Sequence, residues 1–175
     1  MIIGKKIRLR NKRLADALDD YTWQTDRELA RLDAAPLLAT TFAQYLSDYA
    51  SELRCHSSGR HQFAIETLEG KHIGNCVYYD INESKGEAEL GIIIGNCDYW
   101  DKGYGADAVA NLVNYIFRRT SIRRLYLKTL DWNARAQKCF KKCGFMSYGH
   151  LGKDGYSFVL MELHCKQWKK QQAEA

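Results

Sequence analysis

A glycine-spaced turn follows directly on an apolar stretch of the chain, and a helical pattern comes next. The turn contains Lys102, Gly103 and Gly105, and the apolar stretch includes residues 92–94. The N-terminus of a helix carries backbone N–H groups without intrahelical partners, and such groups bind phosphate. Glycine lets the backbone approach a ligand closely, and Lys102 adds a positive charge. This order predicts a cradle for the pyrophosphate of a nucleotide-like cofactor.

The composition is that of one folded domain. The chain has 175 residues, of which 46% are hydrophobic and 27% charged. A single proline and several helical patterns argue against a disordered or fibrous chain. No apolar run approaches the roughly 20 residues of a membrane span, and the N-terminal residues show no apolar signal segment. We therefore expect one cytoplasmic domain over residues 1–175, with a polar tail at 166–175 that frays.

The six cysteines show no metal-binding spacing. Cys139 and Cys143 lie four residues apart in a predicted helix, a spacing that suits packing better than a disulfide. We expect reduced, mostly buried thiols and no metal site.

The net charge of +5 is mild, and basic residues gather at 118–124 and at 141–142. These two groups are either solvated surface or contacts with cofactor phosphates. They lack the interleaved aromatic residues of a strand-binding platform, which argues against a nucleic-acid partner.

Two periodicities divide the chain into elements. Alternating or continuous apolar residues predict strands, and apolar residues three or four positions apart predict helices. The predicted strands are 5–10, 62–67, 72–82, 87–95, 122–130, 145–150 and 156–164, and the predicted helices are 13–34, 41–55, 103–119 and 133–143. Asp26 is expected to cap the second part of the first helix, and Gly144 to end the last helix in a left-handed conformation.

The order of these elements predicts a mixed sheet. Strand 87–95, helix 103–119 and strand 122–130 form a β-α-β unit, which requires a parallel pair of strands. The remaining strands are joined by short turns and must be antiparallel. The fold class is therefore α/β (α+β): a mostly antiparallel sheet with a central parallel pair and helices on both faces. The cofactor is expected at the C-terminal end of strand 87–95.

Two segments together resemble the signatures of one family. Residues 100–106, Trp-Asp-Lys-Gly-Tyr-Gly-Ala, resemble the acetyl-CoA phosphate loop of the GNAT N-acetyltransferase superfamily, Gln/Arg-x-x-Gly-x-Gly/Ala. Residues 133–145 resemble its second signature, Asn-x-x-Ala/Ser-x-x-x-Tyr-x-Lys-x-Gly-Phe. The chain looks like the RimJ/RimL-like, ribosomal-protein acetyltransferase branch. The resemblance covers nearly the whole chain and is weakest at 20–60, where the family lines its acceptor site.

The resemblance implies the GNAT fold and transfer of the acetyl group of acetyl-CoA to a primary amine by direct attack in a ternary complex. It implies that the pyrophosphate is held by five consecutive residues, which are Lys102, Gly103, Tyr104, Gly105 and Ala106. It further implies that the pantetheine arm pairs with the backbone of Ile93 and Gly95 and hydrogen-bonds Asn133. Lys138 either reaches coenzyme A or is solvated.

Two positions depart from the family pattern. Trp100 occupies the Gln/Arg position of the loop, a replacement that this branch commonly shows. Phe140 occupies the position of a tyrosine that is thought to protonate the leaving thiolate, and phenylalanine cannot donate a proton. Tyr104 or Tyr126 is the candidate acid in its place.

Glu89 is the first candidate for the base that deprotonates the incoming amine. It flanks the cofactor strand, where burial would raise its pKa towards neutrality. A structural or surface carboxylate would give the same sequence. His61 and His72 are further candidate bases.

Segment 14–35 contains six acidic and two basic residues, in a protein whose net charge is positive. Since relatives place this segment over the acceptor pocket, it suggests a cationic acceptor: a protein N-terminus, a polyamine or an amino sugar. An outer, charged helix face is the alternative. Because Phe140 lacks the acid, a catalytically weak acyl-CoA-binding or sensing module is the alternative function. A homodimer is a common default for a small enzyme.

Overall fold

The computed structural model describes residues 1–55 and 59–174. The strands are β1 (Ile2–Ile3), β2 (Ile7–Arg10), β3 (Arg60–Thr67), β4 (His72–Asn82), β5 (Glu87–Ile94), β6 (Arg124–Leu130), β7 (Met146–Lys153) and β8 (Tyr156–His164). The helices are η1 (Leu14–Asp16), α1 (Ala17–Gln24), α2 (Arg27–Leu32), α3 (Phe42–Glu52), η2 (Cys97–Tyr99), α4 (Tyr104–Arg119), α5 (Ala134–Lys142) and α6 (Cys165–Glu174). Within this described part, no helix is long and apolar enough to cross a membrane.

All the strands belong to one sheet, in the order β1-β2-β3-β4-β5-β6-β8-β7. The neighbours β5 and β6 run parallel, and every other neighbouring pair is antiparallel. The predicted mixed sheet with one central parallel pair is therefore confirmed.

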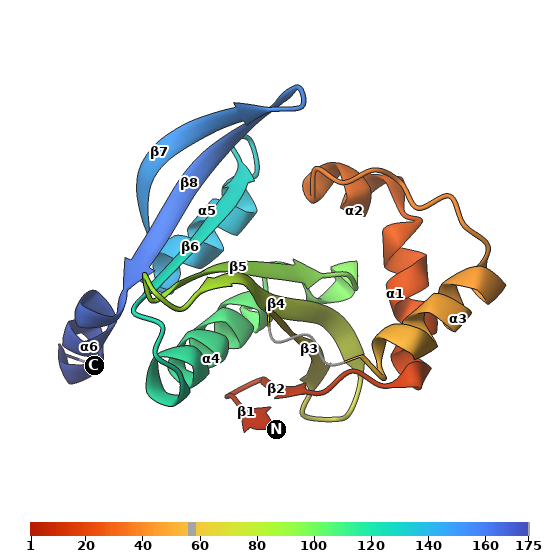
Figure 1. The fold of residues 1–175 in the computed structure, drawn as a ribbon, viewed down its shortest axis with the longest axis horizontal. Helices are drawn as coiled ribbons and strands as arrows, with labels where there is room; N and C mark the ends of the chain where they lie inside the picture. Colours follow the sequence, from red (N-terminus) through yellow and green to blue (C-terminus); the bar gives the residue numbers. More distant parts are fainter. Residues whose placement is uncertain (56–58, 175) are drawn as a thin grey trace.

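Helices cover both faces of the sheet (Figure 1). Helix α4 buries Val109, Leu112, Val113 and Ile116, which share one helical face and pack into the main core. Helix α1 packs on the opposite face, where a Cβ atom on Gly95 would lie only 2.0 Å from the Trp23 ring. Helices α2 and α3 lie beside α1 in Figure 1. These three helices contain most of segment 20–60, in which the resemblance to the family is weakest.

The predicted element boundaries hold to within a few residues, and the predictions for β4 and β8 match the observed bounds. The predicted helix 13–34 is divided into η1, α1 and α2. Asp26 caps α2 as expected, because its Oδ1 accepts a hydrogen bond from the Leu29 N–H at 2.9 Å. Gly144 follows α5 with a φ of 91°, the left-handed conformation expected of it.

The expectation of a frayed tail was wrong, because α6 packs against the domain. Trp168 is only 7% exposed, its ring lies 5.6 Å from that of Phe117, and its Nε1 donates to Asn114 Oδ1 at 2.9 Å. One buried tryptophan anchors a segment that is otherwise polar, which leaves too little apolar periodicity for sequence-based prediction.

All six cysteines are free thiols. Cys76 and Cys165 are buried, but Cys55 and Cys97 are exposed, so the expectation of mostly buried thiols holds for only part of the set. Burial raises the pKa of the Cys76 thiol, which makes it unreactive at neutral pH.

Strands β5 and β6 separate after a short paired segment. Their last paired residues are Glu89 and Tyr126. Beyond that point β5 continues along β4 as far as Ile94, and β6 continues along β8 as far as Leu130. Figure 1 shows the two arms of the sheet diverging from this point, which we call the fork. The fork leaves the facing edges of β5 and β6 without a neighbouring strand.

The position of β5 depends on the glycine opposite it in β4. A Cβ atom on Gly74 would lie 2.1 Å from the carbonyl oxygen of Ile93, so Gly74→Ala forces the two strands apart. We expect this substitution to lower the free energy of unfolding by about 1–3 kcal/mol in chemical denaturation. Gly152→Ala is the control, because a Cβ there meets no atom within 4 Å. An unchanged unfolding free energy for Gly74→Ala would contradict this close approach.

Candidate active site

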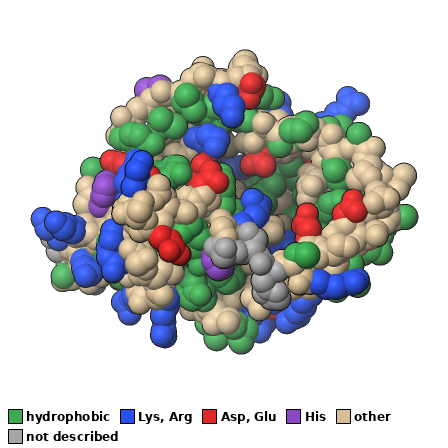
Figure 2. Space-filling model, viewed as in Figure 1, with side chains coloured by type: hydrophobic (Ala, Val, Ile, Leu, Met, Phe, Trp, Pro, Cys, Tyr) green, Lys and Arg blue, Asp and Glu red, His purple; other side chains and the backbone are tan. Residues whose placement is uncertain are grey.

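The fork opens into a cavity of about 700 Å³, which we call the fork cavity. Its walls are β5, β6, the C-terminal end of α2, the N-terminal turn of α4, α5 and the turn between β7 and β8. Cavities of this size hold cofactors and small molecules. In the space-filling view, acidic and basic side chains stand close to one another around the central hollow (Figure 2).

Alternate residues of β5 present their backbone groups to the fork. The Gly86 carbonyl accepts hydrogen bonds from residues leading into β6, and the Ile94 carbonyl accepts one from Trp100 Nε1 at 2.7 Å. The Ile93 carbonyl points instead towards Gly74 of β4. Because backbone direction alternates along a strand, the backbone of Ile92, like that of Ile94, faces the fork.

This register differs by one residue from the pantetheine contacts expected from sequence. Ile93 lines the cavity, but its backbone faces β4. Gly95 lies beyond the end of β5, under the Trp23 ring, and does not line the cavity. Three consecutive isoleucines do not show which backbone groups face the fork, because the pairing of β5 with β4 decides this.

The N-terminal turn of α4 has the backbone conformation that the predicted phosphate cradle requires. Gly103 is the N-cap, with a φ of 84°, and a Cβ there would meet no atom within 4 Å. The Asp107 N–H already bonds to the Gly103 carbonyl at 3.0 Å, and the N–H groups of residues 104–106 precede that first intrahelical bond. Gly103, Gly105 and Ala106 line the fork cavity. The backbone of this turn can therefore hold an anion there.

Two side chains expected at the cradle point elsewhere. Lys102 Nζ donates to the Asp98 carbonyl at 2.7 Å. The Tyr104 ring packs edge-on against Tyr99, with the Lys6 ammonium 5.3 Å from its centroid. Neither Lys102 nor Tyr104 lines the cavity, so the structure gives no support to the Tyr104 phenol as an acid.

The side chains that bring positive charge to the cavity come from α5, β6 and β7, and Lys102 of the loop is not among them. Arg135, Lys138 and Lys142 all line the cavity, and the Arg135 guanidinium lies 3.4 Å from the centroid of the Trp100 ring. Sequence reasoning missed Arg135, although it lies inside the second signature. Arg124, from the basic group at 118–124, instead pairs with Glu87 and Glu162.

Asn133 and Phe140 lie where the second signature places them. Asn133 is the N-cap of α5, with its Oδ1 accepting from the Ala136 N–H at 3.1 Å, and it also lines the cavity. Its amide NH₂ group remains available to a ligand. Phe140 is 6% exposed, lines the cavity and packs edge-on against Phe145, so an apolar ring occupies the position of the family's tyrosine.

Glu89 lies at the fork itself. It is 8% exposed, it lines the cavity, and its Oε1 accepts a hydrogen bond from Lys128 Nζ at 2.7 Å. Burial, together with the neighbouring Glu89 carboxylate, raises the pKa of Tyr79, so that phenol stays protonated. Glu89, Lys128 and Tyr79 are thus three titratable side chains that line the same cavity.

The other candidate acids and bases lie outside the fork cavity. Tyr126 stacks on Arg124, and His61 stacks on Tyr78. His72 Nδ1 lies 3.1 Å from Asp19 Oδ2. None of these candidates lines the cavity, whereas Tyr156, which sequence reasoning missed, does.

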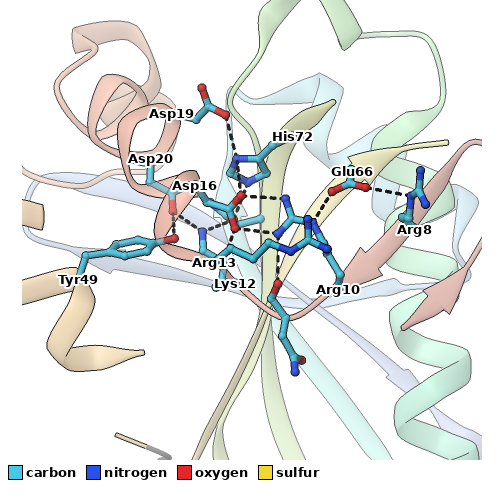
Figure 3. A network of polar contacts seen from close by, with 12 residues as sticks. Arg8, Arg10, Lys12, Arg13, Asp16, Asp19, Asp20, Tyr49, Glu66 and His72 are labelled. Atoms are coloured by element: carbon cyan, nitrogen blue, oxygen red, sulfur yellow. Dashed lines mark hydrogen bonds and ion pairs between the residues drawn. The ribbon is translucent and has the colours of Figure 1, made fainter. Parts of the chain in front are cut away.

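Most of the acidic segment 14–35 holds α1 and α2 in place, as Figure 3 shows for Asp16, Asp19 and Asp20. The pairs are Asp16 with Arg10, Asp19 with His72, Asp20 with Lys12, Tyr49 and Asn75, Asp26 with the Leu29 N–H, and Glu28 with Arg31. Asp33 is the acidic residue of this segment that lines the fork cavity. The segment as a whole therefore does not face the cavity, and only its Asp33 carboxylate remains a candidate contact with the acceptor.

No group of three or more His, Cys, Asp or Glu residues in the described ranges is arranged to hold a metal ion.

Comparisons with known proteins show the family of this chain. The model of the acetyltransferase (GNAT) domain matches residues 6–146. The N-acetyltransferase p20 of Bacillus licheniformis is 24% identical over 148 residues, covering 84% of this chain and 83% of its own. The spermidine N(1)-acetyltransferase of Vibrio cholerae is 27% identical over 96 residues, which is 55% of each chain.

Solved structures show the same fold. Spermidine N-acetyltransferase from Vibrio cholerae, in complex with CoA and spermine, superposes with a TM-score of 0.82 at 20% identity, covering 93% of this chain and 98% of that one. The aminoglycoside acetyltransferase AAC(6')-Ib in complex with coenzyme A gives 0.77 at 20% identity, covering 95% and 99%. Since the family model covers most of the sequence, the chain belongs to the GNAT acetyltransferase family and is an acyltransferase.

Proposed function

We propose that this enzyme transfers the acetyl group of acetyl-CoA to the primary amine of a small or peptide acceptor, by direct attack in a ternary complex. The observation that carries the proposal is the fork. Beyond its last described pairing with β6, the edge of β5 leads to the N-terminal turn of α4, and both line one cavity.

The residues of the cavity fit acetyl-CoA as the cosubstrate. In our proposal the N–H groups of residues 104–106 bind the pyrophosphate, with positive charge from Arg135, Lys138 and Lys142. The backbone of Ile92 and Ile94 receives the pantetheine arm as an added strand, and the Asn133 amide bonds its far side. Lys102 and Tyr104 then contribute through their backbone and not through their side chains.

Glu89 is proposed as the base. An alkylamine is mostly protonated at neutral pH and must lose a proton before it attacks the thioester carbonyl. Glu89 lies beside the free edge of β5, where the N–H of Ile92 can stabilise the oxyanion. Holding the amine and the thioester together in attack geometry accounts for much of the rate enhancement, since such positioning removes roughly 7–11 kcal/mol of barrier.

The departing thiolate takes its proton from a group other than Phe140. Three phenols line the cavity: Tyr79, Tyr99 and Tyr156. Our proposal assigns the donor to one of these phenols or to water in the cavity, since a phenol can donate where phenylalanine cannot.

We also propose a branch of the family, an acceptor class and an oligomeric state for this enzyme. The opening Ile-Arg-Leu-Arg and the Tyr99-Trp100 pair support the RimJ/RimL-like branch. The relatives whose names give a substrate act on spermidine or an aminoglycoside, which supports an amine acceptor. We further propose a homodimer, the commonest assembly of small enzymes, which light scattering on the purified protein tests directly.

Release of the CoA thiol over a panel of amines tests the activity. The panel contains a diamine, an aminoglycoside, a monoamine and a peptide with a free N-terminus. We expect acetyl-CoA-dependent thiol release with at least one of them, together with an acetylated product detected by mass. Tight binding of acetyl-CoA without thiol release on any amine would favour the sensing module instead.

A further inference from the structure

The fork cavity has a cofactor side and an acceptor side. Leu90 of β5 is buried in the core that α4 fills, so alternate side chains of β5 face α4. Glu89 and Ile93 therefore face the opposite side of the sheet, the side on which α1 packs. Asp33, at the C-terminal end of α2, lines the cavity from α2 together with Leu29 and Leu32.

Asp33 is the acidic residue that α2 contributes to the cavity lining, in addition to Asp101 and Asp154 from two turns. Within residues 1–55 and 59–174, the Asp33 carboxylate makes no hydrogen bond or ion pair, whereas Glu89 is paired with Lys128. Asp33 is an exposed residue, so a ligand can reach its carboxylate. Partial desolvation raises the pKa of this carboxyl, and the positive charge of Lys128 opposes that shift. An unpaired carboxylate that lines the cavity attracts a cationic group of a bound ligand.

The basic residues of the cavity do not fill this role. Arg135, Lys138 and Lys142 belong to α5, on the cofactor side, and Lys128 is already bonded to Glu89. Lys153 lines the cavity from the end of β7 and makes no ion pair with Asp33 in the described structure. An incoming ammonium at Asp33 would therefore meet a free carboxylate rather than displace an existing ion pair.

We propose that Asp33 binds a second ammonium group of the acceptor, so that the preferred substrates are di- or polyamines. The attacked amine reaches Glu89, the distal ammonium lies at Asp33, and the methylene chain between them contacts Leu32. This inference rests on the proposed acetyl transfer and adds to it a site for the other end of the acceptor.

The test compares two acceptors of equal chain length, 1,5-diaminopentane and 1-aminopentane, which differ only in the second ammonium. Thiol release is measured with the wild type, Asp33→Asn, Asp33→Glu and the control Asp48→Asn. Asp48 is exposed on α3, bonds only Gln44 among the described side chains and does not line the cavity.

We expect the wild type to prefer the diamine by at least about tenfold in kcat/KM, as a charge-assisted contact implies. Asp33→Asn should remove this preference by raising KM for the diamine and should leave the monoamine and acetyl-CoA parameters unchanged. Asp33→Glu should keep much of the preference, and Asp48→Asn should keep all of it.

Three results would overturn the inference, and they are distinguishable. Equal use of the two amines by the wild type, or an intact preference in Asp33→Asn, contradicts the site at Asp33 while leaving acetyl transfer standing. No acetylation of any amine by a wild type that binds acetyl-CoA contradicts the proposed function, and the inference with it.

Discussion

Replacing Glu89 by glutamine is expected to lower kcat for an amine acceptor by about 10²–10⁴-fold, the usual contribution of a general base. Glutamine keeps the size of the side chain but cannot take a proton from the incoming ammonium. Glu89 lies at the fork and is nearly buried, so bulk water does not readily replace it. Affinity for acetyl-CoA, measured by calorimetry, should be unchanged because the phosphate cradle is not altered.

Glu87→Gln is the matched control for this prediction. Glu87 belongs to the same strand, pairs with Arg124 at 2.9 Å and does not line the fork cavity. Its kcat should stay within about twofold of the wild type, since it touches no reacting atom. Full activity of Glu89→Gln across pH would show that another group removes the proton.

Replacing Arg10 by methionine is expected to lower the free energy of unfolding by about 3–5 kcal/mol, as removal of one partner from a buried ion pair does. Arg10 is 7% exposed. Its guanidinium bonds both oxygens of Asp16 at 2.8 Å and also contacts Glu66 (Figure 3). The substitution leaves the buried Asp16 carboxylate without its arginine and leaves Glu66 paired with Arg8 alone. Chemical denaturation measures the loss.

Two further variants separate lost charge pairing from lost packing. Arg8→Met removes a more exposed arginine that contacts the same Glu66, and it should cost less than about 1 kcal/mol. Adding Asp16→Asn to Arg10→Met should recover part of the loss, because one orphan charge is then removed. No recovery would mean that packing of the Arg10 stem, and not its charge, stabilises the layer.

The same network makes the free energy of unfolding depend on pH. Burial alone would raise the pKa of Asp16, but hydrogen bonds from Arg10 and from the Arg13 N–H bring that pKa below its usual range. The contribution of Asp16 is therefore complete above the pKa of an unfolded aspartate, about 4, and is lost as pH falls through the lower folded value. Arg10→Met should lose this stabilisation at neutral pH and show a weaker loss on acidification.

The turns and helix caps of the proposed cofactor half could be predicted from sequence because their signals are local. The glycine at 103 has the left-handed conformation that only glycine adopts without strain, and the helix behind it begins where the apolar periodicity starts. Asn133 caps α5 from the first position of its motif. Such features depend on residues a few positions apart, so a sequence contains them in full.

The acceptor half could not be predicted, because it depends on partners far apart in the chain. Asp19 and Asp20 look alike in sequence, yet one bonds His72 and the other Lys12, and neither reaches the cavity. Asp33 lines the cavity only because α2 turns towards the fork. In the same way, pairing with β4 decided that the backbone of Ile92, and not that of Ile93, faces the fork.

Amide hydrogen exchange at single residues of β5, followed by NMR with and without CoA, tests the central claim most directly. Bound CoA should slow exchange of the Ile92 and Ile94 N–H groups, which face the fork, and should leave Ile93, which faces β4, unchanged. Unaltered exchange at Ile92 and Ile94 in a protein saturated with CoA would contradict the fork as the cofactor site.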